Sequence, residues 1–131
     1  QGKAINSENF AVGSQGKDII QKWGKPDGES SSKDAYFYSR RNIEFFLSDD
    51  KVTHIVSYDP DYTNITYSEV KHTLGEPAEE TRGDEGVYMT YEYGKKMLVI
   101  ALYYDRTGKN PDTIKNVIVT DQYKRLQAMM R

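Results

Sequence analysis

Gly13–Pro26, GSQGKDIIQKWGKP, is answered further along the chain by Asn64–Pro77, NITYSEVKHTLGEP. The two stretches align without a gap, and their apolar, glycine and proline positions coincide: Ile19 with Val70, Trp23 with Leu74, Gly24 with Gly75, and Pro26 with Pro77. Apolar residues at helical spacing, followed by Gly and Pro, are typical of a short amphipathic helix with a glycine C-cap. The chain therefore reads as one small unit used twice, and Trp23 and Leu74 are expected to be buried at matching positions.

The start signals of the two helices differ. Ser14 is the expected N-cap of the first helix, which should end at Trp23. Thr66 and Glu69 form the pattern of a capping box, in which each residue satisfies a backbone N–H of the other. The second helix is therefore expected to begin just after Thr66.

Each predicted helix is followed by three apolar runs that are separated by turn residues, which is typical of an antiparallel meander. The runs cover residues 35–39, 43–47 and 52–58 in the first unit, and residues 87–93, 97–104 and 113–120 in the second. The polar segments 27–34 and 78–86 are predicted to be loops.

These elements predict an α+β fold of two tandem units, each a helix plus an antiparallel meander. A unit of about 60 residues would be marginally stable alone, so the two are expected to share one sheet with both helices on one face. Residues 1–131 are taken as a single domain built of units at about 10–60 and 61–122. The tail 123–131 is expected to form a short helix.

Composition excludes several classes of protein. The chain has 18 basic and 20 acidic residues and a net charge of -2, without the basic stripe of a nucleic-acid binder. It has no cysteine, which excludes disulfides, thiolate metal sites and a cysteine nucleophile. No apolar run is long enough to span a bilayer, so no membrane span is expected.

Catalytic and metal-binding patterns are missing from the sequence. His54 and His72 lack the spacing of a metal-ligand pair, so neither metal nor cofactor is expected. No nucleophile elbow is present, and the paired carboxylates lie in turn segments where their pKa values are expected to be ordinary. The chain is therefore predicted not to be an enzyme, with a small glycan-active or other hydrolytic enzyme as the alternative.

One loop has a weak resemblance to a calcium site. Residues 105–112, DRTGKNPD, place oxygen-bearing side chains at alternate positions around Gly108. The loop lacks the final bidentate Glu of such sites, and Arg106 and Lys109 reduce its negative charge. A turn that connects two strands is the preferred interpretation.

Strand aromatics are the remaining functional signal. The chain contains 11 Tyr and 4 Phe, and strand alternation cannot bury all of those that fall in strands. Surplus aromatics on one sheet face are typical of an interaction surface, although ordinary strand composition is the alternative. The candidate binding residues, on the face opposite the helices, are Tyr36, Phe45, Tyr88 and Tyr103, with Tyr88 first.

The repeated helix ending in Trp/Leu-Gly-x-Pro before a meander is similar to the tandem-repeat fold of the beta-lactamase inhibitor protein family. A single copy resembles the outer-membrane assembly lipoproteins of the BamE (SmpA/OmlA) type. More closely, Gly13–Asp27, GSQGKDIIQKWGKPD, resembles the YjgB-like family of secreted proteins from Gram-positive bacteria, a domain of unknown function. This resemblance implies a secreted or envelope location and a non-catalytic scaffold, and it brings no functional residues to this chain.

These observations favour a non-catalytic secreted or cell-envelope binding module that engages a protein partner or a cell-wall component through its open sheet face. Because the chain begins at Gln1, a signal segment is expected to have been removed. A purely structural envelope-assembly domain is the other alternative.

Overall fold

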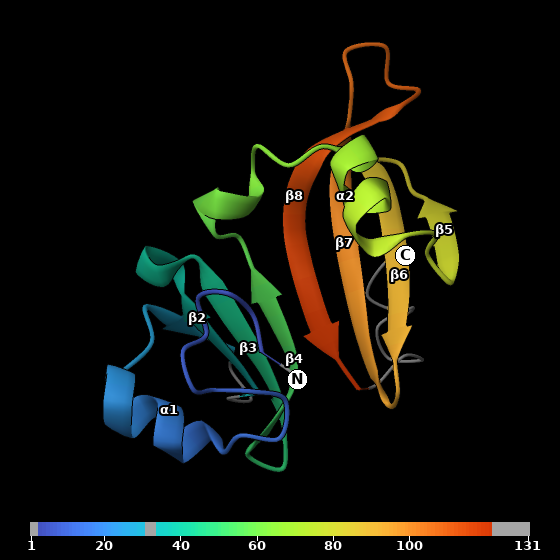
Figure 1. Ribbon diagram of the computed structural model, residues 1–131. Coiled ribbons are helices and arrows are strands. Elements are labelled where there is room, and N and C mark those ends of the chain that lie inside the picture. The colour runs from blue at the N-terminus through green and yellow to red at the C-terminus, as the bar shows by residue number, and fades with distance from the viewer. Residues whose placement is uncertain (1–2, 31–33, 122–131) are drawn as a thin grey trace.

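The computed structural model describes residues 3–30 and 34–121, and it shows an α+β fold (Figure 1). A helix and four strands follow one another twice: α1 (Gly16–Trp23), β1 (Gly28–Glu29), β2 (Ala35–Tyr38), β3 (Ile43–Ser48) and β4 (Lys51–Ser57), then α2 (Tyr67–Leu74), β5 (Glu79–Arg82), β6 (Gly86–Tyr93), β7 (Lys96–Tyr104) and β8 (Pro111–Thr120). The short 3-10 helices η1 (Ser39–Arg41) and η2 (Pro60–Tyr62) lie in the connections. Below, α1 to β4 is called the first half and α2 to β8 the second half.

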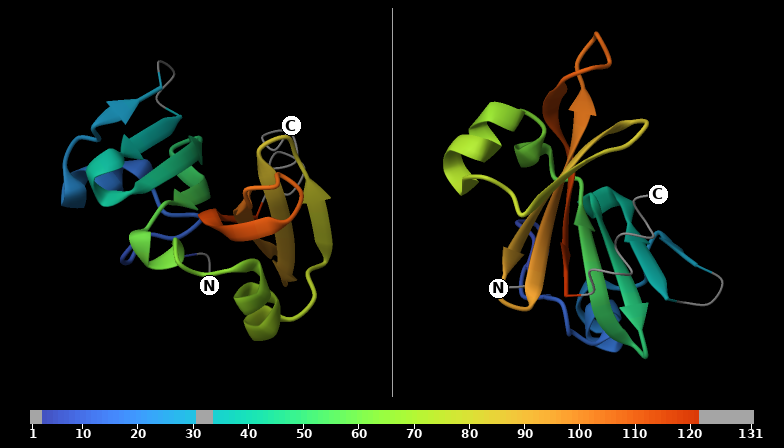
Figure 2. Two further views of the ribbon diagram at one scale, coloured as in Figure 1. Left: turned by 90° about the horizontal axis from the view of Figure 1, so that it is seen from above. Right: turned by 90° about the vertical axis from the view of Figure 1, so that its right-hand side faces the viewer.

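All eight strands form one antiparallel sheet in the order β1-β2-β3-β4-β8-β7-β6-β5. The predicted α+β class, with one antiparallel sheet and two helices, is confirmed. The halves join where β4 pairs with β8, and Val56 lies directly opposite Ile118 at this junction. Figure 2 shows that the sheet twists strongly across the junction, as antiparallel sheets do.

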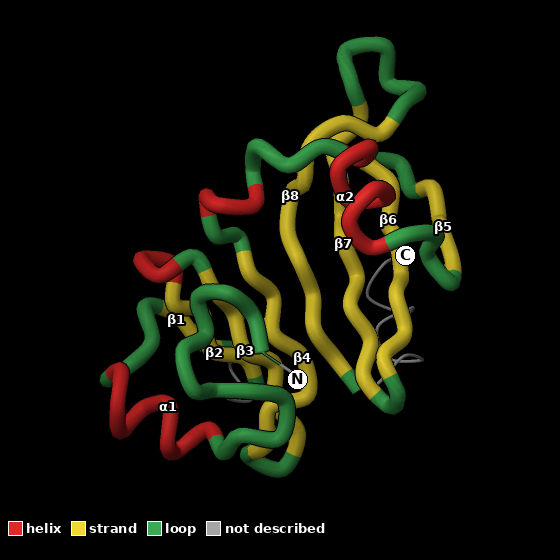
Figure 3. The backbone as a smooth tube through the Cα atoms, viewed as in Figure 1, coloured by secondary structure: helices red, strands yellow, loops and turns green. Residues whose placement is uncertain are grey.

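Each helix buries one central residue in a cluster of its own half. Ile19 of α1 is fully buried with Phe45 and neighbouring side chains of β2, β3 and β4. Val70 of α2 packs with Ile100 and neighbouring side chains of β6, β7 and β8. A third cluster contains Val56, Val99 and Ile118, around the junction of the two halves. Figure 3 shows these helices and strands along the backbone.

The segments predicted to be loops contain the two edge strands, β1 and β5. These strands end the sheet on either side, so each has one paired edge. All of their residues are exposed or only partly buried. An edge strand with so little apolar surface lacks the alternation by which a strand is recognised in sequence, which explains the wrong prediction.

One of the two predicted helix N-caps is confirmed. Glu69 N–H donates to Thr66 Oγ1 at 3.2 Å and Thr66 N–H to Glu69 Oε1 at 3.3 Å, so the capping box is confirmed. Ser14, however, is not the N-cap of α1, which begins at Gly16 after Gln15. Ser14 Oγ instead accepts from the N–H of Ala11 at 2.9 Å, because it closes a turn before the helix.

The helix ends are buried less evenly than expected. Trp23 is partly buried and packs against Phe10, Tyr38 and Phe45. Leu74 is 38% exposed, so its predicted burial is wrong. The predicted tail helix at 123–131 lies outside the described residues. Within the described ranges, no helix has the length and apolar character needed to cross a bilayer.

Candidate functional site

Two of the predicted binding residues lie in the core. Tyr36 and Phe45 sit opposite each other on β2 and β3 and are 6% and 0% exposed. Both belong to the cluster around Ile19 of α1. Their burial differs from the exposure that was expected, because in the adjacent pair Phe45-Phe46 it is Phe45 that points toward the helix. Alternation places the two rings on opposite faces without deciding which is inside.

The other two predicted residues lie on the opposite face. Tyr88 packs against the third cluster, Val56, Val99 and Ile118, and is partly buried. Tyr103 is 50% exposed and follows Val99 on β7 by an even number of residues, so the two share a face. Of the four candidates, the structure therefore brings Tyr88 and Tyr103 to the same side of the sheet.

Two further aromatics join them there. Phe46 packs against the third cluster, and Tyr58, which is 38% exposed, follows Val56 by two residues just after β4. Sequence reasoning included both among the strand aromatics but did not select them. The signal for Phe46 was its adjacency to Phe45, whereas the place of Tyr58 depends on the pairing of β4 with β8.

A hollow of about 220 Å³ lies among these side chains. We call it the central depression, because its lining includes the opposed pair Val56 and Ile118, where the two halves join. Both halves contribute to its lining, which consists of Glu44, Phe46, Val56, Tyr58, Tyr88, Asn116 and Ile118.

A small polar network crosses the central depression. The hydroxyl of Tyr58 donates to Glu44 Oε1 at 3.4 Å, and the side chain of Asn116 lies in the same lining. Burial raises the pKa of the Glu44 carboxyl, an effect that the hydrogen bond from Tyr58 partly offsets. Burial, followed by the charge of Glu44, raises the pKa of the Tyr58 hydroxyl. Both groups are therefore held in their neutral forms more strongly than in water.

Asn116 adds an unused acceptor to this network. Its residue is 8% exposed, and its Oδ1 atom has no hydrogen-bond partner among the described residues. Buried polar atoms are satisfied in the great majority of cases, so this oxygen, which is itself buried, is an acceptor that lacks a donor. Aromatic walls, an apolar floor and an available acceptor suit a bound group that carries a hydroxyl, amide or ammonium.

The same lining fits hydrolysis less well. Glycoside hydrolysis commonly needs two carboxylates on either side of the scissile bond. Of the described residues that line the central depression, Glu44 is the one that carries a carboxylate.

In the 105–112 loop, the carboxylate of Asp105 is hydrogen-bonded within the loop itself. Asp105 Oδ1 accepts from the N–H and hydroxyl of Thr107, and Oδ2 accepts from Asn110 Nδ2 at 3.2 Å. These hydrogen bonds, led by that from the Thr107 side chain, hold the pKa of Asp105 below its ordinary value. Across the described parts of the chain, no group of three or more His, Cys, Asp or Glu side chains gathers so as to hold a metal ion.

The fold and this geometry define an α+β domain with one eight-stranded antiparallel sheet and two helices. Residues 1–120 match the family model of DUF4309, a domain of unknown function, and the chain belongs to this family. The fold is similar to the crystal structure of a DUF4309 family protein, YjgB, from Bacillus subtilis subsp. subtilis str. 168. The TM-score is 0.73 at 12% sequence identity, covering 92% of this chain and 88% of that chain. No curated protein matches this chain.

The expected likeness to a YjgB-like family of unknown function is thereby confirmed. At 12% identity, the similarity to the solved structure shows the shared fold alone. The likeness to the beta-lactamase inhibitor protein and to BamE-type lipoproteins stays a prediction.

Proposed function

We propose that this chain is a non-catalytic binding module of a secreted or cell-envelope protein. It engages a protein partner or a cell-wall component through the sheet face that carries the central depression. The observation that carries this proposal is that Phe46, Tyr58 and Tyr88 line one hollow together with Asn116, whose buried Oδ1 atom is unpaired.

The chemistry of this face supports a recognition surface. Tyr and Phe are enriched at protein interfaces, where a ring supplies contact area and a hydroxyl supplies orientation. Tyr58 and Tyr103 are 38% and 50% exposed beside a nearly buried apolar floor. A ring that is half exposed next to such a floor gains contact area when a partner covers it.

The proposal includes two tandem units with both helices on the face away from the central depression. Ile55 and Val119 pack in the α1 cluster and Val117 in the α2 cluster. These residues alternate along β4 and β8 with Val56 and Ile118, which belong to the third cluster. This alternation supports an arrangement of the kind expected from the resemblance to the beta-lactamase inhibitor protein.

The proposal is tested by removing exposed aromatic rings and measuring whether the protein still captures its partner. The double variant Tyr58→Ala/Tyr103→Ala is compared with Tyr93→Ala, which removes a ring that is 53% exposed elsewhere on the sheet. Each protein is immobilised and exposed to solubilised envelope proteins from a Gram-positive bacterium, and is separately sedimented with purified cell walls. We expect the double variant to keep its thermal midpoint within a few degrees and to lose capture, while Tyr93→Ala retains it.

The two arms separate the classes of partner, because capture from the envelope fraction indicates a protein and cosedimentation indicates a wall component. Equal capture by the double variant and the wild type would remove the support for this face. If the wild type binds neither an envelope protein nor cell walls at any protein concentration, the structural envelope-assembly alternative is favoured.

The raised pKa of Glu44 is the observation that favours the enzymatic alternative, because catalytic acids have perturbed pKa values. A hydrolase that uses Glu44 as its acid would release reducing sugar from cell-wall polysaccharide and lose that activity in Glu44→Gln. We expect no release from the wild type. Activity that disappears in Glu44→Gln while the fold is retained would replace the binding proposal by the enzymatic one.

A further inference from the structure

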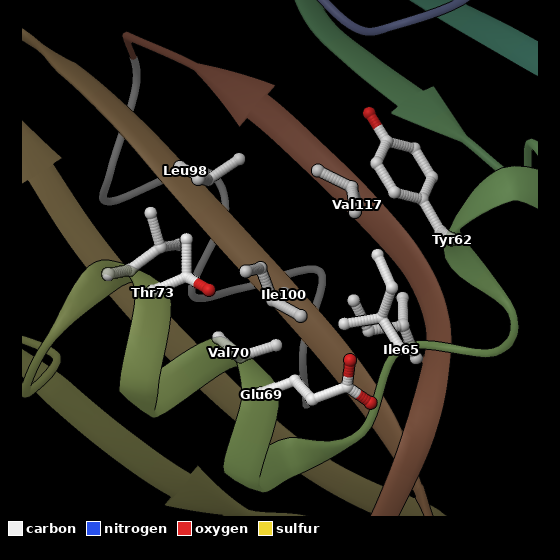
Figure 4. A pocket seen from close by; sticks show the side chains of 10 residues that line it. Tyr62, Ile65, Glu69, Val70, Thr73, Leu98, Ile100 and Val117 are labelled. Carbon is white, nitrogen blue, oxygen red and sulfur yellow. The ribbon is translucent and has the colours of Figure 1, made fainter.

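A second hollow, of about 310 Å³, lies on the α2 side of the second half. Figure 4 shows it between α2 and the strands β7 and β8, with Tyr62 entering from the neighbouring η2. We call it the α2 pocket. Leu98, Ile100 and Val117 form its floor, and α2 contributes Val70 and Leu74. Of the described residues that line it, Glu69 is the one that carries a charge.

The first half has a place that corresponds to the α2 pocket of the second half. Trp23 and Leu74 are the last residues of their helices, and each precedes a glycine C-cap with positive φ. Phe45 pairs with Ile55 of β4, and Ile100 pairs with Val117 of β8.

The backbone around both places is also alike. In each half, an isolated bridge joins the N-cap residue of the helix to one of the first three residues of the last strand: Gln15 to Lys51 of β4, and Thr66 to Thr113 of β8. Trp23 therefore corresponds to Leu74, and Phe45 to Ile100.

An aromatic side chain fills the matching place in the first half. Phe10, which is 7% exposed, stacks edge-on against Trp23 at 5.2 Å and against Phe45 at 6.2 Å between ring centroids. Phe10 reaches this position from the segment that precedes α1. The two residues that it contacts are the counterparts of Leu74 and Ile100, which line the α2 pocket.

The ring in the segment before α2 is Tyr62, which is partly buried and lines the α2 pocket beside Val117 but leaves the hollow open. The residue 51 positions after Phe10, by the offset that aligns the two helices, is Asp61, an exposed residue at η2. Leu74 and Ile100 are also smaller than Trp23 and Phe45. The α2 pocket is thus the space that Phe10 and two larger side chains fill in the first half.

We propose that the α2 pocket binds a phenylalanine-type side chain presented by a segment of a partner protein, as the first half holds Phe10. A cavity of about 150 Å³ lined by Leu, Ile and Phe is enough to bind benzene, so the volume here accommodates a phenyl ring together with part of its backbone. Glu69 places a carboxylate in the lining of the pocket. The bound segment therefore carries a neutral or basic residue near its ring.

The chain itself suggests the probe. A capped hexapeptide copies residues 8–13 with Lys in place of Glu8, and a matched control peptide carries Ala in place of Phe10. Binding is followed by the methyl NMR signals of Leu98, Ile100 and Val117. We expect saturable shifts with the Phe peptide and none with the Ala peptide at the same concentration. A third peptide that keeps Glu8 should bind at least a few-fold more weakly, because its carboxylate meets that of Glu69.

Two variants rebuild the packing of the first half inside the pocket. Ile100→Phe restores the ring found at Phe45, and Leu74→Trp restores the ring found at Trp23. Each should fold, reach at least the wild-type thermal midpoint and lose peptide binding. Leu74 lies at an exposed helix end, where a larger side chain is accommodated more easily. Leu74→Trp therefore still tests the proposal if Ile100→Phe fails to fold. Tyr58→Ala, at the central depression, should bind the peptide like the wild type, which separates this inference from the proposed function.

Other occupants give different results, and each would overturn the proposal. Equal shifts with the Phe and Ala peptides would exclude recognition of the ring. Nuclear Overhauser contacts from the pocket methyls to the chain's own residues beyond position 121, in the free protein, would identify an internal occupant. Shifts that follow protein concentration without peptide would identify a second copy. Shifts confined to Ile19 and Leu47 would mean that the peptide had replaced Phe10 in the first half.

Discussion

Tyr38 and Tyr91 make the same hydrogen bond in the two halves of the molecule. Each hydroxyl donates to the carbonyl of the glycine that ends the preceding helix, Tyr38 to Gly24 at 2.8 Å and Tyr91 to Gly75 at 2.9 Å. The two glycines have φ values of 81° and 82°. Carbonyls at a helix end lack intrahelical partners, so each tyrosine satisfies one and fixes its helix against the sheet.

Loss of either hydroxyl should therefore destabilise the fold. Tyr38→Phe and Tyr91→Phe should each lower the free energy of unfolding by about 1 kcal/mol, since a ring of the same shape remains while the carbonyl loses its donor. Urea unfolding followed by circular dichroism measures the change. Tyr93→Phe, at a ring that is 53% exposed, is the matched control and should leave the midpoint unchanged. Similar midpoints for all three variants would show that the two hydrogen bonds contribute nothing measurable.

Tyr38 should also make stability depend on alkaline pH. Burial, with a smaller contribution from Tyr36, raises the pKa of Tyr38 to about 12, whereas a tyrosine in the unfolded chain ionises near pH ~10. The folded state thus holds its proton longer than the unfolded state does. The contribution is complete below the unfolded pKa and is lost as pH rises toward the folded pKa. Between these two values, the urea midpoint of Tyr38→Phe should fall less steeply with pH than that of the wild type, and parallel curves would contradict this assignment.

Local signals in the sequence account for much of the fold. The Gly-x-Pro spacing located both helix ends, and Thr66 with Glu69 located the start of α2. Features that depend on distant pairing could not be read in this way. Tyr58 joins Tyr88 because β4 pairs with β8, and no local pattern marks that junction. The edge strands β1 and β5 are too polar to show alternation, and Phe45 and Phe46 became distinguishable once the position of α1 was known.

The unequal burial of Trp23 and Leu74 leads to unequal costs on truncation. Trp23→Ala removes a ring that contacts Phe10, Tyr38 and Phe45 and lies under the Arg41 guanidinium at 4.2 Å, so it should cost about 3 kcal/mol. Leu74→Ala, at a side chain that is 38% exposed, should cost about 1 kcal/mol or less. Urea unfolding of the two variants measures both. Equal costs would mean that Leu74 is covered in solution.

Gly86 should tolerate no side chain. A Cβ atom at this position would overlap the carbonyl oxygen of Leu102 on β7, and a backbone atom cannot yield as a flexible side chain does. Gly86→Ala should therefore destabilise the protein by about 3 kcal/mol, the upper end for overpacking. Gly28→Ala is the control, because its Cβ would meet Phe37 at an ordinary 3.5 Å. The thermal midpoint of Gly28→Ala should stay close to that of the wild type. A Gly86→Ala protein with the same thermal midpoint as Gly28→Ala would contradict the close approach of β6 to β7 at Gly86.

Glu44 should weaken the fold at neutral pH and cease to do so in acid. Burial raises the pKa of this carboxyl above its ordinary value, so the folded state binds the proton more tightly than the unfolded state does. The ionised group therefore costs stability above the folded pKa, and the cost disappears as pH falls below the unfolded pKa.

Replacement of the carboxyl by an amide isolates this effect. Glu44→Gln keeps an oxygen that can accept from Tyr58 and never ionises, so its urea midpoint should exceed that of the wild type at pH ~7 and meet it below pH ~4, where a glutamate in the unfolded chain is protonated. Glu92→Gln, at an exposed glutamate of β6, should follow the wild type at both values. If Glu44→Gln is the less stable protein at neutral pH, the hydrogen bond from Tyr58 outweighs desolvation. The central depression would then be built to hold a carboxylate, and a cationic group on the partner would be favoured over a neutral donor.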